Sequence, residues 1–318
     1  MEFEVNSLLS QKKLCLVLDL DHTLVNTTRL ADLTLDEEYL KDRTISSLFR
    51  LDKYGIITKL RPFVHKFLQE ASKMFELCIY TMGERAYALE MAKLLDPENQ
   101  YFQSRIISKD DYPKRDKKEL NVLKVPESLV IVLDDTKMVW EKNRENLILI
   151  DRYCYFSSSC HDFGYKNCKS LSQLGRDEDE CDGALANILR ALIRIHREFY
   201  DNDRSIADRD VRQMLKTAKQ DVLRGCKIVF SEVFPRNYGA ANHSLWKMAE
   251  GLGAICSTEL DFSVTHVVST NGDNEKSRWA VQEGKFLVHP RWIEAAYYLW
   301  RRHLEDEFPV NVAKCLSK

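Results

Sequence analysis

Apolar residues gather into four short runs in the first half of the chain, at 14–18, 75–80, 129–133 and 147–150. All but the second run are free of charged residues, and none alternates regularly between apolar and polar positions. Such runs are typical of strands buried on both faces, as in a parallel sheet. The pattern therefore predicts an α/β fold built on a parallel sheet.

Apolar residues at helical spacing lie between these runs. One predicted helix follows Pro62, which is well placed to open it, and a second covers residues 84–95. Residues 26–56 are polar and mixed, and we interpret them as an excursion between the first strand and a short strand at 56–60. Excursions beside the active end of a sheet often shape the substrate cleft.

The alternation of strands and helices restarts near residue 223. Before that point, a helix at 183–200 carries an apolar stripe, and a more polar helix at 207–220 has the character of a linker. After it, the pattern gives a compact unit of βαββαβα-like order, large enough to fold alone. We therefore predict three parts, at 1–182, 183–221 and 222–312.

Composition and charge narrow the function classes. The 318 residues are 44% hydrophobic and 30% charged, and 47 basic residues against 49 acidic ones leave a formal net charge of -2. This balance argues against a general nucleic-acid binder, which would carry a basic excess, and no apolar run approaches membrane-spanning length. Nine cysteines without a Cys-x-x-Cys pair favour a reducing compartment. We expect neither direct nucleic-acid contact nor membrane contact.

Paired carboxylates follow two of the predicted strands. Asp19 and Asp21 come after the first apolar run, and Asp134 and Asp135 after the third. The carboxyl ends of parallel strands form the ligand-binding edge of such sheets, and close carboxylates repel unless a cation lies between them or one holds a proton. Solvated surface acids are the alternative. Two strands that both end in paired acids favour a metal, and such oxygen ligands suit Mg²⁺.

A second group of residues fits a bound phosphate. Thr81 ends the second run, and Gly83 allows a phosphate to approach the backbone N–H groups at the following helix N-terminus. The alternative is that Thr81 only caps this helix, and the sequence favours neither. One lysine of the charged stretch 109–118 is expected to serve the site. Lys118 is preferred because it precedes a short helical stretch, and Lys117 is the second choice.

These residues carry a resemblance to known enzymes. The string Asp-Leu-Asp-x-Thr-Leu at 19–24 resembles the nucleophile motif of the haloacid-dehalogenase superfamily of aspartate-based phosphatases. Nearly the whole chain resembles the RNA polymerase II C-terminal-domain phosphatases of the TFIIF-associating type with a BRCT domain, most closely the plant members. The segments that carry this resemblance are 18–24, 59–62, 80–83, 132–135, 225–231, 265–268 and Trp292. The segment between Thr81 and Asp134 is too short for the extra helical domain that some members insert there.

The resemblance implies a haloacid-dehalogenase-like Rossmannoid sheet with helices on both faces, followed by a small α/β BRCT domain. It implies that Asp19 is the nucleophile that forms an aspartyl-phosphate. Asp21 would protonate the departing serine oxygen and then activate the hydrolytic water. Thr81 and Lys118 would stabilise charge on the transferred oxygens.

Metal ligands and partners also follow from the resemblance. Mg²⁺ would be held by Asp19, the backbone carbonyl of Asp21, Asp134 and Asp135, with Asp135 as the closer ligand. The substrate would be the phosphorylated C-terminal domain of RNA polymerase II in the nucleus, with TFIIF as a further candidate partner. The stretch 114–118 is only a weak nuclear-import cluster, so the location rests on the resemblance.

BRCT domains often hold a phosphopeptide with a hydroxyl that ends the first strand and a lysine on a later helix. Here Ser231 and Lys276 are the corresponding residues, although a turn residue and a surface helix start are the plainer interpretation. Two other functions remain open: a small-molecule phosphatase of the same superfamily, and a non-catalytic phosphopeptide-binding scaffold. The BRCT unit argues against the first, and the presence of both Asp19 and Asp21 argues against the second.

Overall fold

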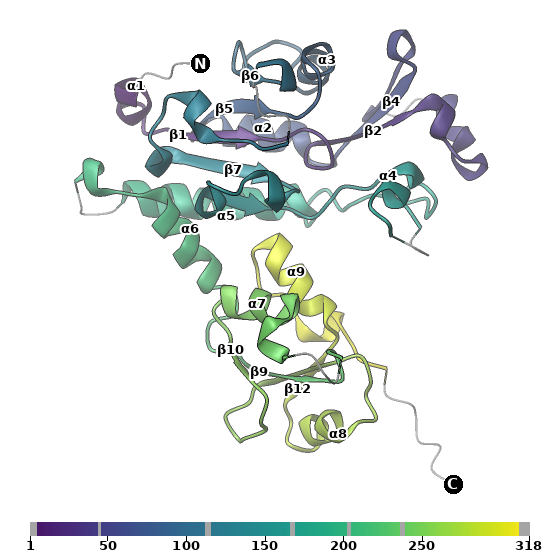
Figure 1. Cartoon of the computed structure of the whole chain (residues 1–318), viewed down its shortest axis with the longest axis vertical. Helices are drawn as coiled ribbons and strands as arrows, with labels where there is room; N and C mark the ends of the chain where they lie inside the picture. The colour runs from purple at the N-terminus through teal and green to yellow at the C-terminus, as the bar shows by residue number, and fades with distance from the viewer. Residues whose placement is uncertain are drawn as a thin grey trace. The chain divides into compact units, whose positions relative to one another are not determined.

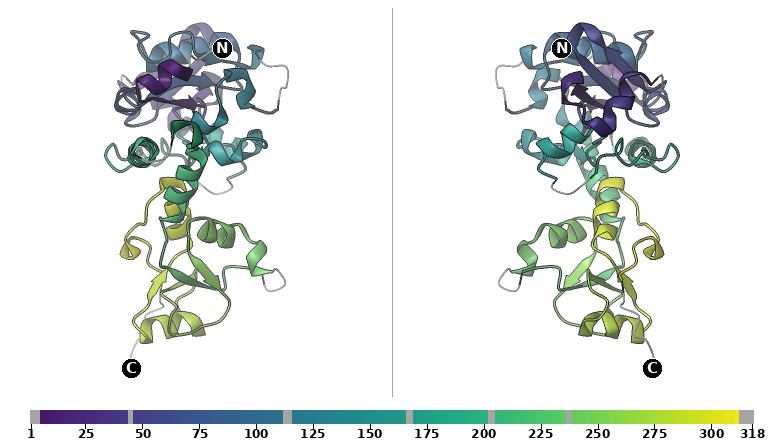
Figure 2. Two further views of the ribbon diagram at one scale, coloured as in Figure 1. Left: turned by 90° about the vertical axis from the view of Figure 1, so that its left-hand side faces the viewer. Right: turned by 90° about the vertical axis from the view of Figure 1, so that its right-hand side faces the viewer.

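The structure is a computed structural model that describes residues 5–43, 46–111, 116–165, 169–201, 205–235 and 239–311. The chain divides into two compact units, Met1–Leu215 and Lys216–Lys318 (Figure 1, Figure 2). Each unit contains its own parallel sheet and its own buried residues. Within the described ranges, no helix combines the length and the apolar character needed to cross a bilayer.

A five-stranded sheet with parallel pairing throughout forms the centre of the first unit. Its order is β6-β5-β1-β7-β8, with β1 Leu14–Leu18, β5 Phe75–Tyr80, β6 Ile106–Ile107, β7 Val130–Asp134 and β8 Leu147–Leu149 (Figure 1). Strands β1 and β7 are buried at every position, which confirms the expectation from the unbroken apolar runs. The four strands expected from these runs are present, and the short edge strand β6 was not expected.

The helices of the first unit are α1 Val5–Ser10, α2 Val64–Ala71, α3 Arg85–Leu95, α4 Ser157–Asp162 and α5 Ala184–Tyr200. α5 packs against α2, and its stripe of Leu192, Ile195 and Phe199 is fully buried. Because of this burial, α5 belongs to the first unit and is not part of a separate linker at 183–221. The division falls inside α6, Val211–Gln220, so the observed boundary differs from the predicted one.

A three-stranded antiparallel sheet of order β2-β4-β3 follows β1, with β2 Val25–Arg29, β3 Leu48–Leu51 and β4 Ile56–Leu60. The sequence predicted β4 but neither β2 nor β3. β2 gives no apolar signal because its buried positions include Asn26 and Thr28. Asn26 Oδ1 accepts the backbone N–H of Tyr155 at 2.8 Å, and the Thr28 hydroxyl bonds that of Ser158 at 2.8 Å. These hydrogen bonds satisfy the buried polar groups of Asn26 and Thr28. In a sequence pattern, polar residues such as these usually indicate exposed positions.

The second unit holds a four-stranded parallel sheet of order β10-β9-β11-β12. Its strands are β9 Lys227–Ser231, β10 Ile255–Ser257, β11 His266–Ser269 and β12 Phe286–Val288, and its other helices are α7 Ser244–Gly251, α8 Glu275–Gln282 and α9 Arg291–Leu299. The order along the chain confirms the expected βαββαβα pattern, although no residues had been assigned to the strand that is β10. Trp292 on α9 is fully buried in the core of this unit.

Candidate active site

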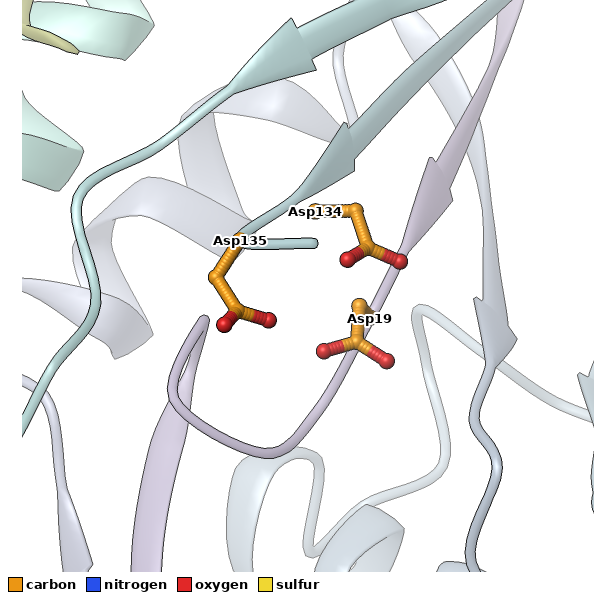
Figure 3. Close-up of side chains that lie close together, drawn as sticks. All are labelled: Asp19, Asp134 and Asp135. Atoms are coloured by element: carbon orange, nitrogen blue, oxygen red, sulfur yellow. The ribbon is translucent and has the colours of Figure 1, made fainter. Parts of the chain in front are cut away.

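Three carboxylates converge where two neighbouring strands end (Figure 3). Asp19 follows β1, Asp134 ends β7, Asp135 comes next, and one oxygen of each lies within 4.8 Å of the others. The parallel pairing of β1 with β7 brings them together, because the Asp19 N–H donates to the Leu133 carbonyl at 3.0 Å. The side chains of three expected metal ligands therefore share one place in the structure.

Lys118 lies between two of these carboxylates. Its ammonium donates to Asp19 Oδ1 at 2.6 Å and to Asp134 Oδ2 at 2.7 Å, and its side chain is only 2% exposed. Lys117 instead forms an ion pair with Glu141 at 2.9 Å, and its side chain is 30% exposed. Of the two lysines considered from the sequence, Lys118 is the one that contacts the carboxylates.

The electrostatics of the cluster fit a bound cation. Burial raises the pKa of Asp19, and the neighbouring Asp134 raises it further. Burial alone would lower the pKa of Lys118, but Asp134 and Asp19 outweigh it and raise this pKa. Two cations, Lys118 and Arg152, face the three carboxylates, and Asp135 Oδ1 accepts no hydrogen bond from any described residue. A hard divalent cation suits such a set of oxygens.

Asp21 is not part of the three-carboxylate cluster. Its Oδ1 accepts the hydroxyl of Tyr87 at 2.5 Å, and that hydroxyl also bonds the hydroxyl of Thr27 at 2.9 Å. Burial raises the pKa of Asp21, while the hydrogen bond from Tyr87 partly lowers it. A raised pKa suits a carboxyl group that has to carry a proton. Sequence reasoning missed Tyr87, because a tyrosine on an amphipathic helix usually signals packing.

Thr81 follows β5 and stands at the same edge of the sheet as Asp19, because β1 and β5 pair in parallel. Its hydroxyl oxygen accepts the N–H of Gly83 at 3.0 Å. The N-cap residue of α3 is Glu84, so Thr81 does not cap this helix. A Cβ at Gly83 would lie 2.8 Å from a ring carbon of Tyr87, which explains why a glycine occupies the turn.

Two further side chains donate hydrogen bonds to the carboxylates, and neither was predicted as a site residue. The indole N–H of Trp140 donates to Asp134 Oδ2 at 2.8 Å, and the Thr23 hydroxyl donates to Asp19 Oδ2 at 3.2 Å. Thr23 lies in the motif that carries the resemblance, whereas Trp140 is a fully buried aromatic that sequence reasoning would assign to the core. These donors restrict the orientation of both carboxylates.

Arg61 supports the loop that carries Asp21. It is 1% exposed, and its Nη1 donates to the carbonyl of Thr23 at 3.0 Å. Glu178 balances its charge, with 2.6 Å between Arg61 Nη2 and Glu178 Oε1. Arg61 lies in the segment 59–62 that carries the resemblance, and Glu178 lies in the acidic stretch 177–180, but the sequence does not indicate that these two residues pair.

In the second unit, the predicted phosphopeptide residues have partners within the protein. The hydroxyl of Ser231 donates to Oδ1 of Asn274, the N-cap residue of α8, at 2.8 Å. The ammonium of Lys276 donates to the Thr258 carbonyl at 2.7 Å. Glu232, which follows Ser231, adds a negative charge at this strand end and has a φ of 55°. The two residues do not share a partner, and the phosphopeptide site stays a prediction.

Comparison with known proteins identifies relatives of both units. Residues 14–176 match the family described as NLI interacting factor-like phosphatase, and residues 228–292 match a twin BRCT domain. The chain is 54% identical to RNA polymerase II C-terminal domain phosphatase-like 4 of Arabidopsis thaliana, over 96% of this chain and 71% of that protein. It is 32% identical to an RNA polymerase II C-terminal domain phosphatase of Caenorhabditis elegans, over 96% of this chain but 47% of that protein.

Solved structures extend the similarity to the whole fold. Fcp1, described as an essential RNA polymerase II CTD phosphatase, matches with a TM-score of 0.69 and 27% identity over 96% of this chain and 98% of that chain. Fission yeast Fcp1 bound to beryllium fluoride matches with a TM-score of 0.67 and 26% identity over the same shares. These matches confirm a haloacid-dehalogenase-like sheet followed by a BRCT-like unit. Phosphatases of this family are metal-dependent, in agreement with the acidic cluster.

Proposed function

Because the chain belongs to the NLI interacting factor-like phosphatase family, we propose that it removes phosphate from serines in the C-terminal heptad repeats of RNA polymerase II. The observation that carries this proposal is the meeting of Asp19, Asp134, Asp135 and Lys118 at the strand ends of the first unit. Relatives named as RNA polymerase II C-terminal domain phosphatases match 96% of the chain and support the substrate class.

In the first half of the proposed reaction, a carboxylate oxygen of Asp19 attacks the phosphorus in line with the serine oxygen. The bond between phosphorus and Asp19 forms as the bond to serine breaks, which yields an aspartyl-phosphate. Asp21 gives its proton to the departing serine oxygen, and its raised pKa supports this role. Lys118 and Thr81 stabilise negative charge on the phosphoryl oxygens.

In the second half, Asp21 is a carboxylate and takes a proton from a water molecule that attacks the phosphorus of the aspartyl-phosphate. The bond to Asp19 breaks, inorganic phosphate leaves, and Asp21 carries a proton again. The Tyr87 hydroxyl, 2.5 Å from Asp21 Oδ1, orients the carboxyl group in both halves. One residue therefore serves as the acid and then as the base.

Mg²⁺ is the metal that we propose for the acidic cluster. Asp19, Asp134 and Asp135 would hold it together with the backbone carbonyl of Asp21. Mg²⁺ typically takes few carboxylates and keeps positions for water and a substrate phosphate, which fits this set of ligands. When bound, it screens the repulsion between the Asp19 carboxylate and the phosphate dianion.

A nuclear location follows from the proposed substrate. The structure describes only part of the weak nuclear-import stretch 114–118, because residues 112–115 lie outside the described residues. TFIIF as a further partner rests on the resemblance of the sequence alone. Co-purification of the full chain with TFIIF and with phosphorylated RNA polymerase II tests both partners.

A phosphate-release assay distinguishes the proposed function from its alternatives. The full chain is incubated with phosphorylated heptad peptides and, separately, with a panel of small phosphate esters, with Mg²⁺ or with excess chelator. We expect release from the heptad peptides, and we expect the chelator to abolish it. Turnover of small esters alone would support a small-molecule phosphatase, and no release from any substrate would support a non-catalytic scaffold.

A further inference from the structure

Arg152, which has no role in the proposed reaction, contacts the acidic cluster at Asp135. Its Nε donates to Asp135 Oδ2 at 2.6 Å, and its Nη2 donates to the Thr136 hydroxyl at 3.3 Å. The Thr136 hydroxyl donates in turn to the same Asp135 Oδ2 at 3.1 Å. Two donors therefore hold one oxygen of the Asp135 carboxylate.

The guanidinium of Arg152 also lies over an aromatic ring. Its Cζ is 3.9 Å from the centre of the Phe163 ring, within the range of a cation–π contact. Phe163 meets the ring of His22 edge to face, with 4.8 Å between ring centres and an angle of 80° between the planes. His22 directly follows Asp21. The stack therefore joins the loop after Asp21 to the Asp135 side of the cluster.

These contacts suit a residue that orients a ligand. The Nε and Nη2 donors of Arg152 are engaged by Asp135 and Thr136. The Arg152 side chain is 29% exposed, whereas that of Asp135, with which it forms an ion pair at 2.6 Å, is 5% exposed. Asp135 Oδ1 accepts no hydrogen bond within the described part of the chain. One oxygen of Asp135 is fixed, and the other is open to a cation.

We propose that Arg152 is a positioning residue that holds Oδ1 of Asp135 toward the metal site and so raises the affinity for the divalent cation. This inference rests on the proposed metal-dependent reaction. Groups that orient metal ligands through hydrogen bonds typically contribute about 10- to 100-fold in metal affinity. A purely electrostatic role would act in the opposite direction, because a guanidinium repels a cation and its removal would tighten binding. The sign of the change distinguishes the two roles.

The test is calorimetric titration of Mn²⁺ into the substrate-free full chain. Arg152→Gln removes the positive charge. Arg152→Lys keeps the charge but loses the planar guanidinium, which hydrogen-bonds to Asp135 and Thr136 and stacks on the Phe163 ring. We expect both variants to bind Mn²⁺ about 10- to 100-fold more weakly, and the Mg²⁺ concentration for half-maximal activity to rise by a similar factor. Arg194→Gln is the matched control, because Arg194 Nε also pairs with a carboxylate oxygen, that of Glu198 on α5, at 2.6 Å. Its Mn²⁺ affinity should equal that of the wild type.

Unchanged or tighter Mn²⁺ binding by the two Arg152 variants would overturn the positioning role. A wild-type chain that binds no Mn²⁺ would instead contradict the proposed metal-dependent reaction, so the two failures are distinguishable. Thermal unfolding of each variant without metal establishes that it is folded. Should Arg152→Gln fail to fold, Arg152→Lys gives the same test, because it retains the positive charge beside Asp135.

Discussion

The first strand of the central sheet in each unit ends in polar residues, yet the two strand ends are organised differently. β1 leads into Asp19, where three carboxylates from two strands have an oxygen each within 4.8 Å. β9 ends at Ser231, whose hydroxyl donates to Asn274, and Lys276 on α8 donates to the Thr258 carbonyl. The first strand end concentrates charge, whereas the polar groups named at the second have neutral partners within the protein.

The difference between these strand ends lies in the free energy of burying charge. Asp19 is 7% exposed and Asp134 is 1% exposed, and burial together with their proximity raises the pKa of Asp19. A buried ion without a close partner costs several kcal/mol, whereas a neutral hydroxyl such as that of Ser231 requires a single hydrogen bond. The free energy cost of burying these charges at the end of β1 indicates a functional role for the carboxylates. The hydrogen bond of Ser231 at the end of β9 can be explained by its contribution to the fold alone.

The largest expected effect is that of Asp19→Asn, which removes the nucleophile from the charged strand end. The amide keeps the shape of the carboxylate but cannot form the aspartyl-phosphate, so kcat on heptad peptides should fall by several orders of magnitude. Circular dichroism and thermal unfolding check that the variant is folded. Asp52→Asn is the control, because Asp52 pairs with Arg50 at the surface, and it should keep full activity. Substantial turnover by folded Asp19→Asn would remove Asp19 from the nucleophile role.

Lys118→Met tests how far one ammonium stabilises the charged strand end. Without it, Asp19 and Asp134 lose their shared buried cation, so the free energy of unfolding without metal should fall by about 3 kcal/mol. kcat should fall by about 10²- to 10³-fold, because charge on the phosphoryl oxygens loses a partner. Added Mg²⁺ should restore part of the stability, as measured by chemical denaturation with and without the metal.

Lys117→Met is the matched control for this substitution. Lys117 forms a surface ion pair with Glu141, so its loss should change the free energy of unfolding by less than about 1 kcal/mol and leave kcat unchanged. Equal effects of the two substitutions would contradict the distinction between the adjacent lysines.

Tyr87→Phe should shift the pH profile of the reaction. The Tyr87 hydroxyl donates to the ionised form of Asp21 and so partly lowers a pKa that burial raises. Removing this donor should raise the pKa of Asp21 further, because the ionised carboxylate loses a hydrogen bond that stabilises it. The protonated form of Asp21 then persists to higher pH, and the alkaline limb of the pH profile of kcat/KM should shift to higher pH. A downward shift or an unchanged limb would argue against Asp21 as the proton donor.

The smallest effect is expected at the strand end of the second unit. If the BRCT-like unit tethers the phosphorylated tail, Ser231→Ala combined with Lys276→Met should raise KM for long multi-repeat substrates and leave short phosphopeptides unchanged. The change should be no more than a few-fold, because a phosphate competes with Asn274 and Thr258 for these donors. Steady-state kinetics on matched long and short peptides measure it. Equal kinetics on long substrates would assign the unit a phosphate-independent partner.

The residues at the strand ends could be predicted from the sequence, because the pattern that marks them is formed by neighbouring residues. Five apolar residues followed by Asp19 predict a buried strand and a carboxylate at the ligand-binding edge, and both are observed. Lys118 could be preferred because it precedes a short helical turn, observed at Leu120–Leu123. Tyr87 and Arg152 could not be predicted in this way, because their roles depend on contacts between segments far apart in the sequence.

The same limit explains the missed part of the fold. β2 is buried through hydrogen bonds of Asn26 and Thr28 to residues beyond 150, so the sequence pattern lacks the apolar alternation that marks a strand. The pair of Arg61 and Glu178 likewise joins segments whose charges have many other possible partners. Local patterns predicted four strands of the central sheet and the acids that follow two of them, whereas the long-range polar contacts around these acids became visible only in the folded chain.

Trapping of phosphate on Asp19 is the most direct test of nucleophilic catalysis at the charged strand end. Wild-type protein turning over a phosphorylated heptad peptide with Mg²⁺ is quenched in acid and reduced with borohydride, which converts a phosphorylated aspartate into homoserine. Peptide mass spectrometry should locate homoserine at position 19, and it should find none in Asp19→Asn or in chelator. Turnover without modification of Asp19, or with homoserine at another aspartate, would contradict the proposed mechanism.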